Sequence, residues 1–591
     1  SCSDLEIPFE VAIRSGDTTT AQKTKQKKNM PQLLVTTPES LHLLLAQKGY
    51  DEVFKNISTV VVDEWHELIG SKRGVQIELA LSRLKGLKPD LKIWGISATI
   101  GNLEEAKDVL LGNYASPTKM IRAELPKRLE IETIFPDVIE NFPWAGFIGT
   151  KLLPKVVPII YSSQSVLIFT NTRSQSEIWY RQLLEVAPDL AGLIALHHGS
   201  LDQKTRAWVE DNLHAGKLKA VICTSSLDLG VDFSAVDTVI QVGSPKGVAR
   251  FMQRAGRSGH SPGALSKIYF VPTNSLEIIE GAAMRESLKR NVVESRIPYV
   301  RSFDVLIQYL VTLALSNGFK AEEIYNEIKQ TFCYASVTPE EFAWCLDFIT
   351  KGGNALDAYD EFHKVVIEEG IYTVTSRAVA TRHRLSMGTI VSYTAMQVKF
   401  MSGKRIGSIE ENFISKLKPG DVFWFSGNNL EIVHIHHMDV LVRKSKAKKG
   451  LIPSWQGGRM PLSSQLSEMI RYKIDHFFDT DQAEEEELIK LKALFELQAS
   501  RSHLPSNKEF LIESIQTREG YHVFMYPFEG RFVHEGMAAI VARKISEIKP
   551  MTFSIAMNDY GFELLSDQEI PIEEALELDL FGIENLEKEI Q

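Results

Sequence analysis

The stretch from Ile57 to Leu68 decides the fold, and it reads I-S-T-V-V-V-D-E-W-H-E-L. Its run of β-branched residues is typical of a strand buried on both faces of a parallel sheet. The run ends abruptly in two adjacent carboxylates, Asp63 and Glu64. Because ligands of open α/β sheets lie beyond the carboxyl ends of the strands, this pair marks a predicted ligand site. The alternative is that the two acids begin a helix and interact with its dipole.

Similar apolar runs extend this pattern along the first half of the chain. From Glu10 to about Arg290 they alternate with helical patterns, which is the rhythm of βαβ units and predicts parallel sheets. Two prolines, Pro126 and Pro136, interrupt the rhythm before it restarts. We therefore place a boundary between two α/β domains near residue 130.

The second half of the chain changes character twice. From Ile297 the pattern is helical, and residues 338–341 form a capping box with proline at the first helical position. Short β segments follow, and helices with a small ribbon predict a winged helix. Beyond about Arg384 the sequence is β-rich, and residues 422–433 predict a hairpin around a Gly-Asn-Asn turn.

The composition excludes several classes of protein. Of the 591 residues, 44% are hydrophobic and 24% charged, which excludes a disordered tail, a collagen-like fibre and a disulfide mini-protein. With 66 basic and 76 acidic residues the net charge is −10, so the chain is not a globally basic coat for nucleic acid. Four cysteines without a CxxC pair argue against a zinc finger and fit a reducing compartment. No apolar run reaches the roughly 18 residues that span a bilayer, so we expect a cytoplasmic protein without membrane contact.

Further motifs follow the acidic pair in a fixed order. They are S-A-T at 97–99, F-T-N-T-R at 169–173, L-H-H-G-S at 196–200, T-S-S-L-D-L-G-V-D at 224–232 and Q-R-A-G-R-S-G-H at 253–260. Each is weak alone, but together and in this order they resemble the superfamily 2 helicases. Within that superfamily, D-E-W-H-E-L resembles the bacterial Lhr-type branch, and in particular the ligase-associated DEXH-box helicases. Later stretches agree, at 383–390, 453–455, 526–531 and 558–562, so the resemblance covers essentially the whole chain.

The resemblance implies an α/β fold class with four parts. Two are RecA-like domains, the first of them truncated at its N-terminus, at residues 1–130 and 131–295. A winged-helix domain would follow at residues 296–385. The remainder, residues 386–591, would be the β-rich α+β domain that is typical of Lhr-type proteins and is called DEAD/H-associated.

The acidic pair suits ATP hydrolysis. Mg²⁺ bound to a nucleotide keeps most of its waters and takes one or two protein carboxylates, which suits Asp63 as a ligand through water. Glu64 can then orient and deprotonate the attacking water. The resemblance implies the same roles, and it adds that His66, Ser97 and Thr99 link the phosphate state to domain closure. Ser97 and Thr99 could instead merely cap the following turn.

Three arginines form a second candidate group. Arg250, Arg254 and Arg257 are spaced i, i+4 and i+7, so a helix would place three cations on one face. Such a face is costly unless an anion lies opposite, although a salt-bridged surface helix is an alternative. By resemblance, Arg257 is the arginine finger that stabilises charge on the transferred phosphoryl group, Arg254 belongs to the same motif, and Gln253 lies near the attacking water.

Two further features come from the same resemblance. Gly230 and Asp232 resemble the motif that contacts the nucleotide from the second domain. His260 departs from the family pattern, because many members carry a second finger arginine at that position. The role of a second finger therefore stays open.

Small hydrogen-bond donors in these motifs suit contacts to a nucleic-acid backbone, since they approach phosphates closely without reading sequence. The candidates are Thr37, Thr170, Asn171, Arg173, Ser200, Thr224 and Ser225. Several of them also suit helix caps. Trp455 lies beside glycines and beyond a basic run, so it is a candidate platform for base stacking. The alternative is that Trp455 closes a small β core.

One expected motif is absent from these residues. A helicase of this type needs a phosphate-cradling loop, G-x-x-x-x-G-K-[ST], before the D-E-x-H strand, and no such sequence occurs in the 591 residues. In the family that loop lies upstream of the segment that matches Ser1. We therefore expect a fragment truncated at both ends, without appreciable ATPase of its own.

The predicted activity of the intact protein is that of an ATP-dependent DNA helicase or translocase. By resemblance, it uses ATP and Mg²⁺, moves 3′-to-5′ along single-stranded or tailed duplex DNA, and serves DNA repair. An ATP-dependent DNA ligase and other repair proteins are implied partners. Two alternatives stay open: a helicase of RNA or RNA–DNA hybrids, and, for this fragment alone, a nucleic-acid-binding protein without catalysis.

Overall fold

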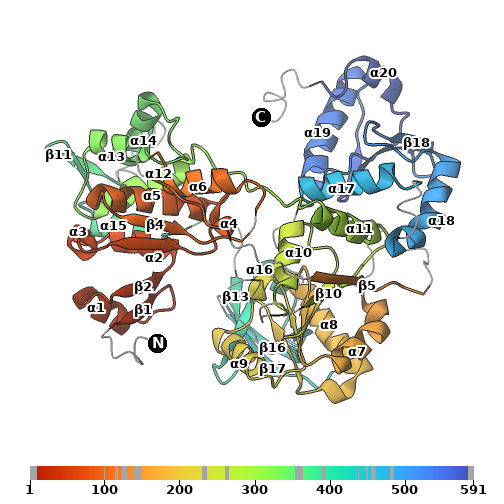
Figure 1. The fold of residues 1–591 in the computed structure, drawn as a ribbon, viewed down its shortest axis with the longest axis horizontal. Helices are drawn as coiled ribbons and strands as arrows, with labels where there is room; N and C mark the ends of the chain where they lie inside the picture. The colour runs from red at the N-terminus through yellow and green to blue at the C-terminus, as the bar shows by residue number, and fades with distance from the viewer. Residues whose placement is uncertain are drawn as a thin grey trace. The chain divides into compact units, whose positions relative to one another are not determined.

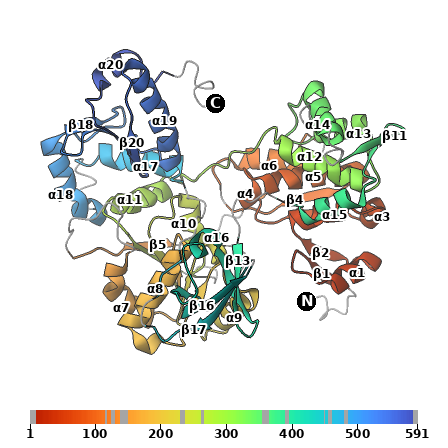
Figure 2. The same cartoon turned by 180° about the vertical axis from the view of Figure 1, so that it is seen from behind.

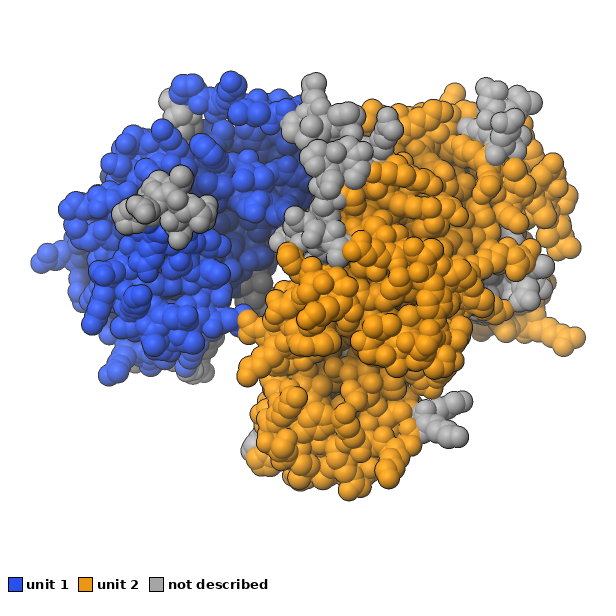
Figure 3. All heavy atoms as spheres, turned by 60° about the horizontal axis from the view of Figure 1, so that its bottom comes forward, with its two compact units in different colours: residues 1–123, 295–392 blue, residues 124–294, 393–591 orange. Residues whose placement is uncertain are grey.

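The computed structural model describes residues 9–98, 100–113, 117–122, 129–137, 149–228, 236–259, 265–352, 364–388, 395–436, 438–447, 450–453, 461–478 and 485–582. The chain divides into two compact units, each made of two separate segments (Figure 3). The first unit comprises residues 1–123 and 295–392, and the second comprises residues 124–294 and 393–591. Within the described ranges, no helix is both long and apolar enough to cross a membrane.

The first unit contains two pairs of parallel strands. β1 (Val11–Arg14) pairs with β2 (Leu33–Thr36), and β3 (Thr59–Val62) pairs with β4 (Lys92–Gly95). The strand predicted from the apolar run before Asp63 is thus confirmed, but the expected burial on both faces is wrong: within β3 Val62 is buried, whereas Val61 is 48% exposed. The helices between and after these strands are α1 (Thr20–Lys28), α2 (Pro38–Leu45), α3 (Tyr50–Phe54), α4 (Trp65–Leu68), α5 (Lys72–Leu87) and α6 (Leu103–Leu111).

The same unit includes a helical part with a small ribbon (Figure 1). Leu79 on α5 and Leu306 on α12 belong to one buried cluster, which joins this part to the strands. The predicted capping box is confirmed, with Thr338 accepting from the backbone of Glu341. These features confirm the winged-helix expectation. The elements are α12 (Phe303–Leu315), α13 (Ala321–Ile328), α14 (Pro339–Lys351), the antiparallel β11 (Val366–Glu368) and β12 (Ile371–Thr373), and α15 (Arg377–Leu385).

The second unit is built on a six-stranded parallel sheet with the order β5-β10-β9-β6-β8-β7. Its strands are β5 (Leu129–Thr133), β6 (Val166–Phe169), β7 (Ile194–His197), β8 (Ala220–Cys223), β9 (Thr238–Val242) and β10 (Ser266–Val271). Every residue of β6, β7, β8 and β9 is buried, as expected for apolar runs covered by helices on both faces. Those helices are α7 (Leu153–Ser162), α8 (Arg173–Val186), α9 (Gln203–His214), α10 (Val248–Ala255) and α11 (Leu276–Lys289), with 3₁₀ turns η1 (Thr150–Leu152), η2 (Pro188–Leu190) and η3 (Ser225–Leu227).

A five-stranded sheet with the order β14-β13-β17-β16-β15 lies beside α9 (Figures 1 and 2). A backbone hydrogen bond joins it to the loop that follows β7 of the six-stranded sheet: Ser408 N donates to Ser200 O at 2.8 Å. The hairpin predicted for residues 422–433 is confirmed, but its turn is Ser426-Gly427, because Asn428 and Asn429 already pair with Phe425 and Trp424. The elements are β13 (Ala395–Phe400), β14 (Arg405–Glu410), α16 (Glu411–Ile414), β15 (Val422–Phe425), β16 (Asn428–His436) and β17 (Asp439–Lys444).

The C-terminal part of the second unit combines helices with a four-stranded antiparallel sheet of order β18-β19-β21-β20. Ile470 of α17 and Leu491 of α18 share one buried cluster with Ile279 of α11, so this part is packed on the helix layer of the parallel sheet. The elements are α17 (Ser464–Asp475), α18 (Glu486–Arg501), β18 (Ile512–Gln516), β19 (Tyr521–Met525), α19 (Arg531–Ile548), β20 (Ser554–Met557), β21 (Phe562–Ser566) and α20 (Ile572–Glu577).

Candidate functional site: an acidic strand end and an arginine helix

The acidic pair lies at the carboxyl end of β3, where the sequence places it. Asp63 is exposed and Glu64 half-buried. Glu64 adopts a left-handed backbone conformation, with φ 50° and ψ 41°, and its N–H donates to Asp63 Oδ1 at 2.9 Å. The short helix α4 begins directly after it, but the Glu64 side chain makes no capping hydrogen bond. The two acids thus precede a helix, as the alternative predicts, but the Glu64 carboxylate does not cap it and stays available for other contacts.

His66 links the acidic pair to the S-A-T motif. Its side chain is buried, and its Nδ1 accepts a hydrogen bond from Ala98 N at 3.1 Å. An accepting Nδ1 places the ring proton on Nε2, which lies 3.5 Å from Glu64 Oε2. Burial lowers the pKa of His66, which favours this neutral tautomer. The imidazole therefore connects the position of Ala98 to the position of Glu64.

Two anchors fix this strand end. Trp65 N donates to Ile96 O at 2.9 Å, and the buried indole N–H of Trp65 donates to Ala106 O at 2.7 Å. Ser97 Oγ donates to Ala98 O at 2.8 Å, so its hydroxyl bonds within the motif itself. Because a large buried aromatic side chain holds the turn, the two carboxylates keep a defined position at its surface.

The three arginines lie on or just after α10 in the second unit. Arg254 is fully buried: Nε donates to Asp228 Oδ1 at 2.9 Å, Nη2 to Asp228 Oδ2 at 3.2 Å, and Nη1 to Gln241 Oε1 at 2.8 Å. Arg250 Nε lies 4.0 Å from the same carboxylate. The anion that faces this part of the helix is thus Asp228 of the chain itself. Such a two-point arginine–carboxylate pair fixes orientation as well as charge.

Gln253 and Arg257 differ from Arg254 in exposure. Both are half-buried, and Arg257 follows the last turn of α10, with its Nε 3.5 Å from Gln253 O. Of the predicted catalytic residues in this motif, these two present their side chains partly to solvent. The geometry therefore makes Arg254 the residue that positions the helix, and it leaves Gln253 and Arg257 as the ones able to meet a ligand.

A residue that sequence reasoning missed holds the other end of α10. Glu294 Oε2 accepts from Ala249 N at 2.6 Å, and Glu294 Oε1 accepts from Val248 N and from Ser463 Oγ, the latter at 2.8 Å. A carboxylate on the first amides of a helix interacts favourably with its dipole. A Cβ atom at position 247 would lie 3.1 Å from Glu294 Oε1, so glycine suits this close approach. No local sequence signal marks Glu294, because it lies far along the chain from α10.

The candidate nucleic-acid contacts of the second unit gather at the carboxyl ends of β6, β7 and β8. Arg173 Nη1 donates to Ser200 Oγ at 2.8 Å, so the structure brings these two residues together. Thr170 is fully buried and bonded to Ser176 and Cys223, and Asn171 Nδ2 donates to Ser244 O at 2.6 Å.

Exposure differs among the remaining candidates. Thr224 and Ser200 are buried, whereas Ser225 is exposed. In the first unit, Thr37 caps α2 by accepting from Ser40 N at 3.3 Å. The predicted dual use of these residues as caps is thus seen at Thr37. Several predicted residues lie outside the described ones, namely Thr99, Gly230, Asp232, His260 and Trp455.

Family models match successive parts of the chain. They are the DEAD/DEAH box helicase at residues 2–107, the helicase conserved C-terminal domain at 150–261, the large helicase-related protein winged helix domain at 286–452, and DEAD/H associated at 504–591. The ATP-dependent helicase Lhr-Core of Methanocaldococcus jannaschii is 30% identical over 98% of this chain and 68% of its own length. The chain belongs to the Lhr-type superfamily 2 helicases.

Other Lhr-type proteins show the same extent of similarity. The Lhr-Core protein 2 of Thermococcus barophilus is 29% identical over 99% of this chain and 70% of its own length. Among solved structures, Mycobacterium smegmatis helicase Lhr bound to single-stranded DNA and AMP-PNP is 25% identical, covers 100% of this chain and 74% of that one, and gives a TM-score of 0.77. The resemblance read from the motifs is confirmed, as is the expected pair of RecA-like domains with a winged helix.

Proposed function

We propose that this Lhr-type chain forms most of the core of an ATP-dependent DNA helicase that moves 3′-to-5′ along single-stranded DNA and serves DNA repair. The observation that carries the proposal is the similarity, along the whole chain, to the Mycobacterium smegmatis Lhr bound to single-stranded DNA and AMP-PNP. The order of the motifs and the exposed acidic pair at the end of β3 support it.

Each unit supplies its own groups to hydrolysis in this proposal. In the first unit, Asp63 would hold Mg²⁺ and Glu64 would accept the proton of the attacking water, while His66 fixes the position of Glu64. Mg²⁺ would neutralise charge on the phosphates. The donor set fits this ion, because an exposed carboxylate beside a second one is what nucleotide-bound Mg²⁺ takes from a protein.

The second unit supplies positive charge and positioning. Arg257 stabilises the transferred phosphoryl group and Gln253 orients the water, with Gly230 and Asp232 as further nucleotide contacts. Arg254, paired with Asp228, and Glu294, at the start of α10, hold the helix that carries them. Ser97 and Thr99 couple the phosphate state of the bound nucleotide to closure of the two RecA-like domains.

The tracking strand meets both units through backbone contacts. Thr37 in the first unit, and in the second Thr170, Asn171, Arg173, Ser200, Thr224 and Ser225, supply hydroxyl, amide and guanidinium donors or the turns that present them. Trp455 stacks on a base. An ATP-dependent DNA ligase and other repair proteins are the partners that the family resemblance favours.

Directional unwinding tests this proposal. A version of the protein extended to include a phosphate-binding loop is given duplex DNA with a 3′ tail or a 5′ tail, and strand separation is followed with ATP. Unwinding of the 3′-tailed substrate alone is expected. A matched substrate with an RNA tracking strand is the control for strand chemistry, and preference for RNA would overturn the DNA assignment. Unwinding from the 5′ tail would overturn the direction.

A further inference from the structure

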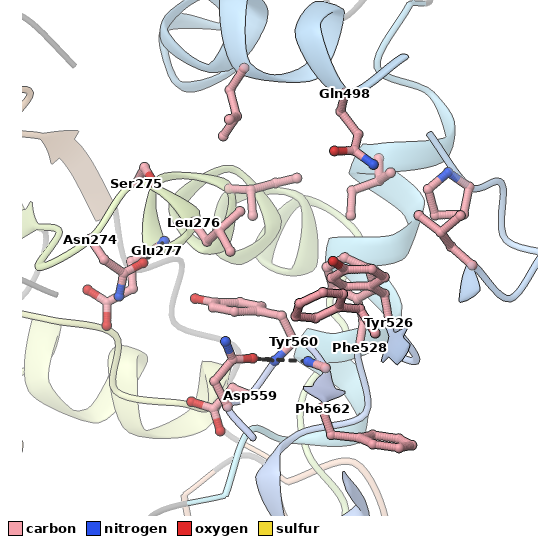
Figure 4. A pocket seen from close by; sticks show the side chains of 18 of the residues that line it. Asn274, Ser275, Leu276, Glu277, Gln498, Tyr526, Phe528, Asp559, Tyr560 and Phe562 are labelled. Carbon is pink, nitrogen blue, oxygen red and sulfur yellow. Dashed lines mark hydrogen bonds between the residues drawn. The ribbon is translucent and has the colours of Figure 1, made fainter. Parts of the chain in front are cut away.

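The second unit contains a hollow that the proposed helicase function does not use (Figure 4). It lies between α11 and the C-terminal part, and its volume is about 520 Å³, which is the size of a small-molecule site. Two of the stretches that carry the family resemblance, residues 526–531 and 558–562, contribute to its wall. Both belong to the second unit, so the cavity is formed within one unit.

One wall of the cavity is aromatic and apolar. The rings of Phe528 and Tyr560 lie 6.2 Å apart between centroids, tilted by 59°. The hydroxyl of Tyr526 donates to Glu513 at 3.1 Å and that of Tyr560 donates to Glu280 at 2.5 Å, so both hydroxyls are already bonded. The faces of these aromatic rings therefore form the wall of the cavity. An aromatic face carries partial negative charge, which attracts cations.

The other end of the cavity is acidic. Lys246 is the one basic residue among the described lining residues, and its Nζ is held at 2.9 Å from Glu280 and 3.0 Å from Asp559. Glu277 lies 3.8 Å from the same nitrogen. Three carboxylates thus surround the ammonium group of Lys246, so negative charge exceeds positive charge at this end of the cavity. An entering anion would meet carboxylates without a cation left to pair with it.

The cavity already shows how a cation is accommodated. The ammonium nitrogen of Lys246 lies 5.8 Å from the centroid of the Tyr560 ring, within the range of cation–π attraction. Among these carboxylates, Asp559 is the most accessible, with 20% of its side chain exposed against 6% for Glu277 and none for Glu280. A second cation would therefore find Asp559 next to the aromatic wall.

We propose that this cavity binds a small organic cation, an amine with an apolar body that lies against Phe528 and Tyr560 and a charged end that faces Asp559. The inference goes beyond the helicase activity and needs neither ATP nor DNA. Lys246 directly precedes Gly247, the N-cap residue of α10, so the ligand would bind beside the anchor of the arginine helix.

Isothermal titration of the purified 591-residue chain tests the proposal with three probes of similar ring size. Benzyltrimethylammonium is the cation, benzyl alcohol the neutral comparison and benzenesulfonate the anion. We expect the neutral probe to bind about 3- to 30-fold more weakly than the cation, and the anion to show no binding. Equal affinity of the cation and the neutral probe would overturn the charge assignment. Tighter binding of benzenesulfonate than of the cation would identify an anion site instead and overturn the proposal.

Variants place the binding in the cavity. Asp559→Asn removes the negative charge and should weaken binding of the cation while leaving that of benzyl alcohol unchanged. Leu276→Trp fills the cavity and should abolish binding of both. Asp439→Asn, which alters another Asp–Lys pair in the five-stranded sheet away from the cavity, is the matched control and should bind as the unmodified chain does. Thermal melting of each variant reports whether it is folded, and unchanged binding by folded Leu276→Trp contradicts the proposal.

Discussion

The parallel strands of the two units have similar sequences but different surroundings. All four residues of β6 are fully buried, whereas Val11 and Ile13 of β1 are 55% and 65% exposed, and Trp94 of β4 is 60% exposed. Parallel sheets occur almost only where both faces are covered, because their strands are apolar on both sides. The second unit meets this condition within the described residues and the first does not. The strands of the first unit therefore expose apolar side chains of the kind that those of the second unit keep covered.

The largest expected effect follows from this contrast. We predict that the 591-residue chain has no appreciable ATPase activity, because it contains no G-x-x-x-x-G-K-[ST] loop to hold the phosphates. A version extended by upstream coding sequence that carries the loop should hydrolyse ATP when single-stranded DNA is added. Phosphate release with and without DNA measures this. DNA-stimulated turnover by the 591-residue chain itself would falsify this prediction.

The acidic pair of the first unit gives the next largest effect. In the extended protein, Glu64→Gln should lower ATP turnover by about 10² to 10⁴, since it removes a positioned base while keeping its shape. DNA binding with ATP should persist. Glu52→Gln, at an exposed glutamate that pairs with Lys55, is the control and should leave turnover unchanged. If Glu64→Gln stays within a few-fold of the unmodified protein, Glu64 is not the base.

The next prediction concerns the second unit, where Arg254 is buried and Arg257 is half-buried. Arg254→Ala leaves the Asp228 carboxylate nearly buried without its partner, and loss of one member of such a pair costs about 3 to 5 kcal/mol of unfolding free energy. Arg257→Ala removes a half-buried side chain and should change stability little while slowing hydrolysis in the extended protein. Chemical denaturation and ATPase rates separate the two. A stable Arg254→Ala protein would show that the pair with Asp228 is not what holds α10.

The helical part of the first unit should respond to acid. Burial lowers the pKa of His383 to about 4, and its Nε2 lies 2.9 Å from Thr312 Oγ1. Because the folded pKa lies below the unfolded value of about 6.5, the neutral ring stabilises the fold above that pH, and the contribution is lost as pH falls toward 4. Between about pH 7.5 and about pH 5 it amounts to roughly 2 kcal/mol.

A substitution isolates this histidine from the others that titrate. His383→Asn should flatten the decline in melting temperature over that pH range, whereas His214→Asn, at an exposed position, should not. An unchanged acid profile in His383→Asn would mean that the ring is protonated or exposed in the folded protein.

The smallest expected effect concerns Glu294. Glu294→Gln weakens the charged cap of α10 and should cost about 0.5 to 2 kcal/mol of stability, as Thr338→Ala should at the cap of α14. The two variants differ in function: only Glu294→Gln should reduce ATPase activity in the extended protein, because only its helix carries Gln253 and Arg257. Equal loss of ATPase activity in both variants would mean that Glu294 acts on stability alone and has no special role in positioning Gln253 and Arg257.

Much of the local structure could be predicted because its causes are local. The strand before Asp63, the capping box at Thr338 and the hairpin at residues 422–433 each depend on neighbours within a few positions, and all three are confirmed. The burial of Arg254 was not predictable in this way. Its spacing with Arg250 and Arg257 indicates a shared face, but the partner that faces it, Asp228, comes from a different part of the sheet.

By itself, the sequence determined the family, the order of the motifs and the position of the acidic pair, since these depend on residue identity and short-range periodicity. Only the tertiary structure decided which segments join: residues 295–392 pack with the first α/β part, and residues from 393 onward pack with the second. It also brought Glu294 to the N-terminus of α10 and formed the cavity beside Lys246. The physical reason is that such contacts join residues far apart in the chain, where burial and charge pairing select among surfaces that no local pattern distinguishes.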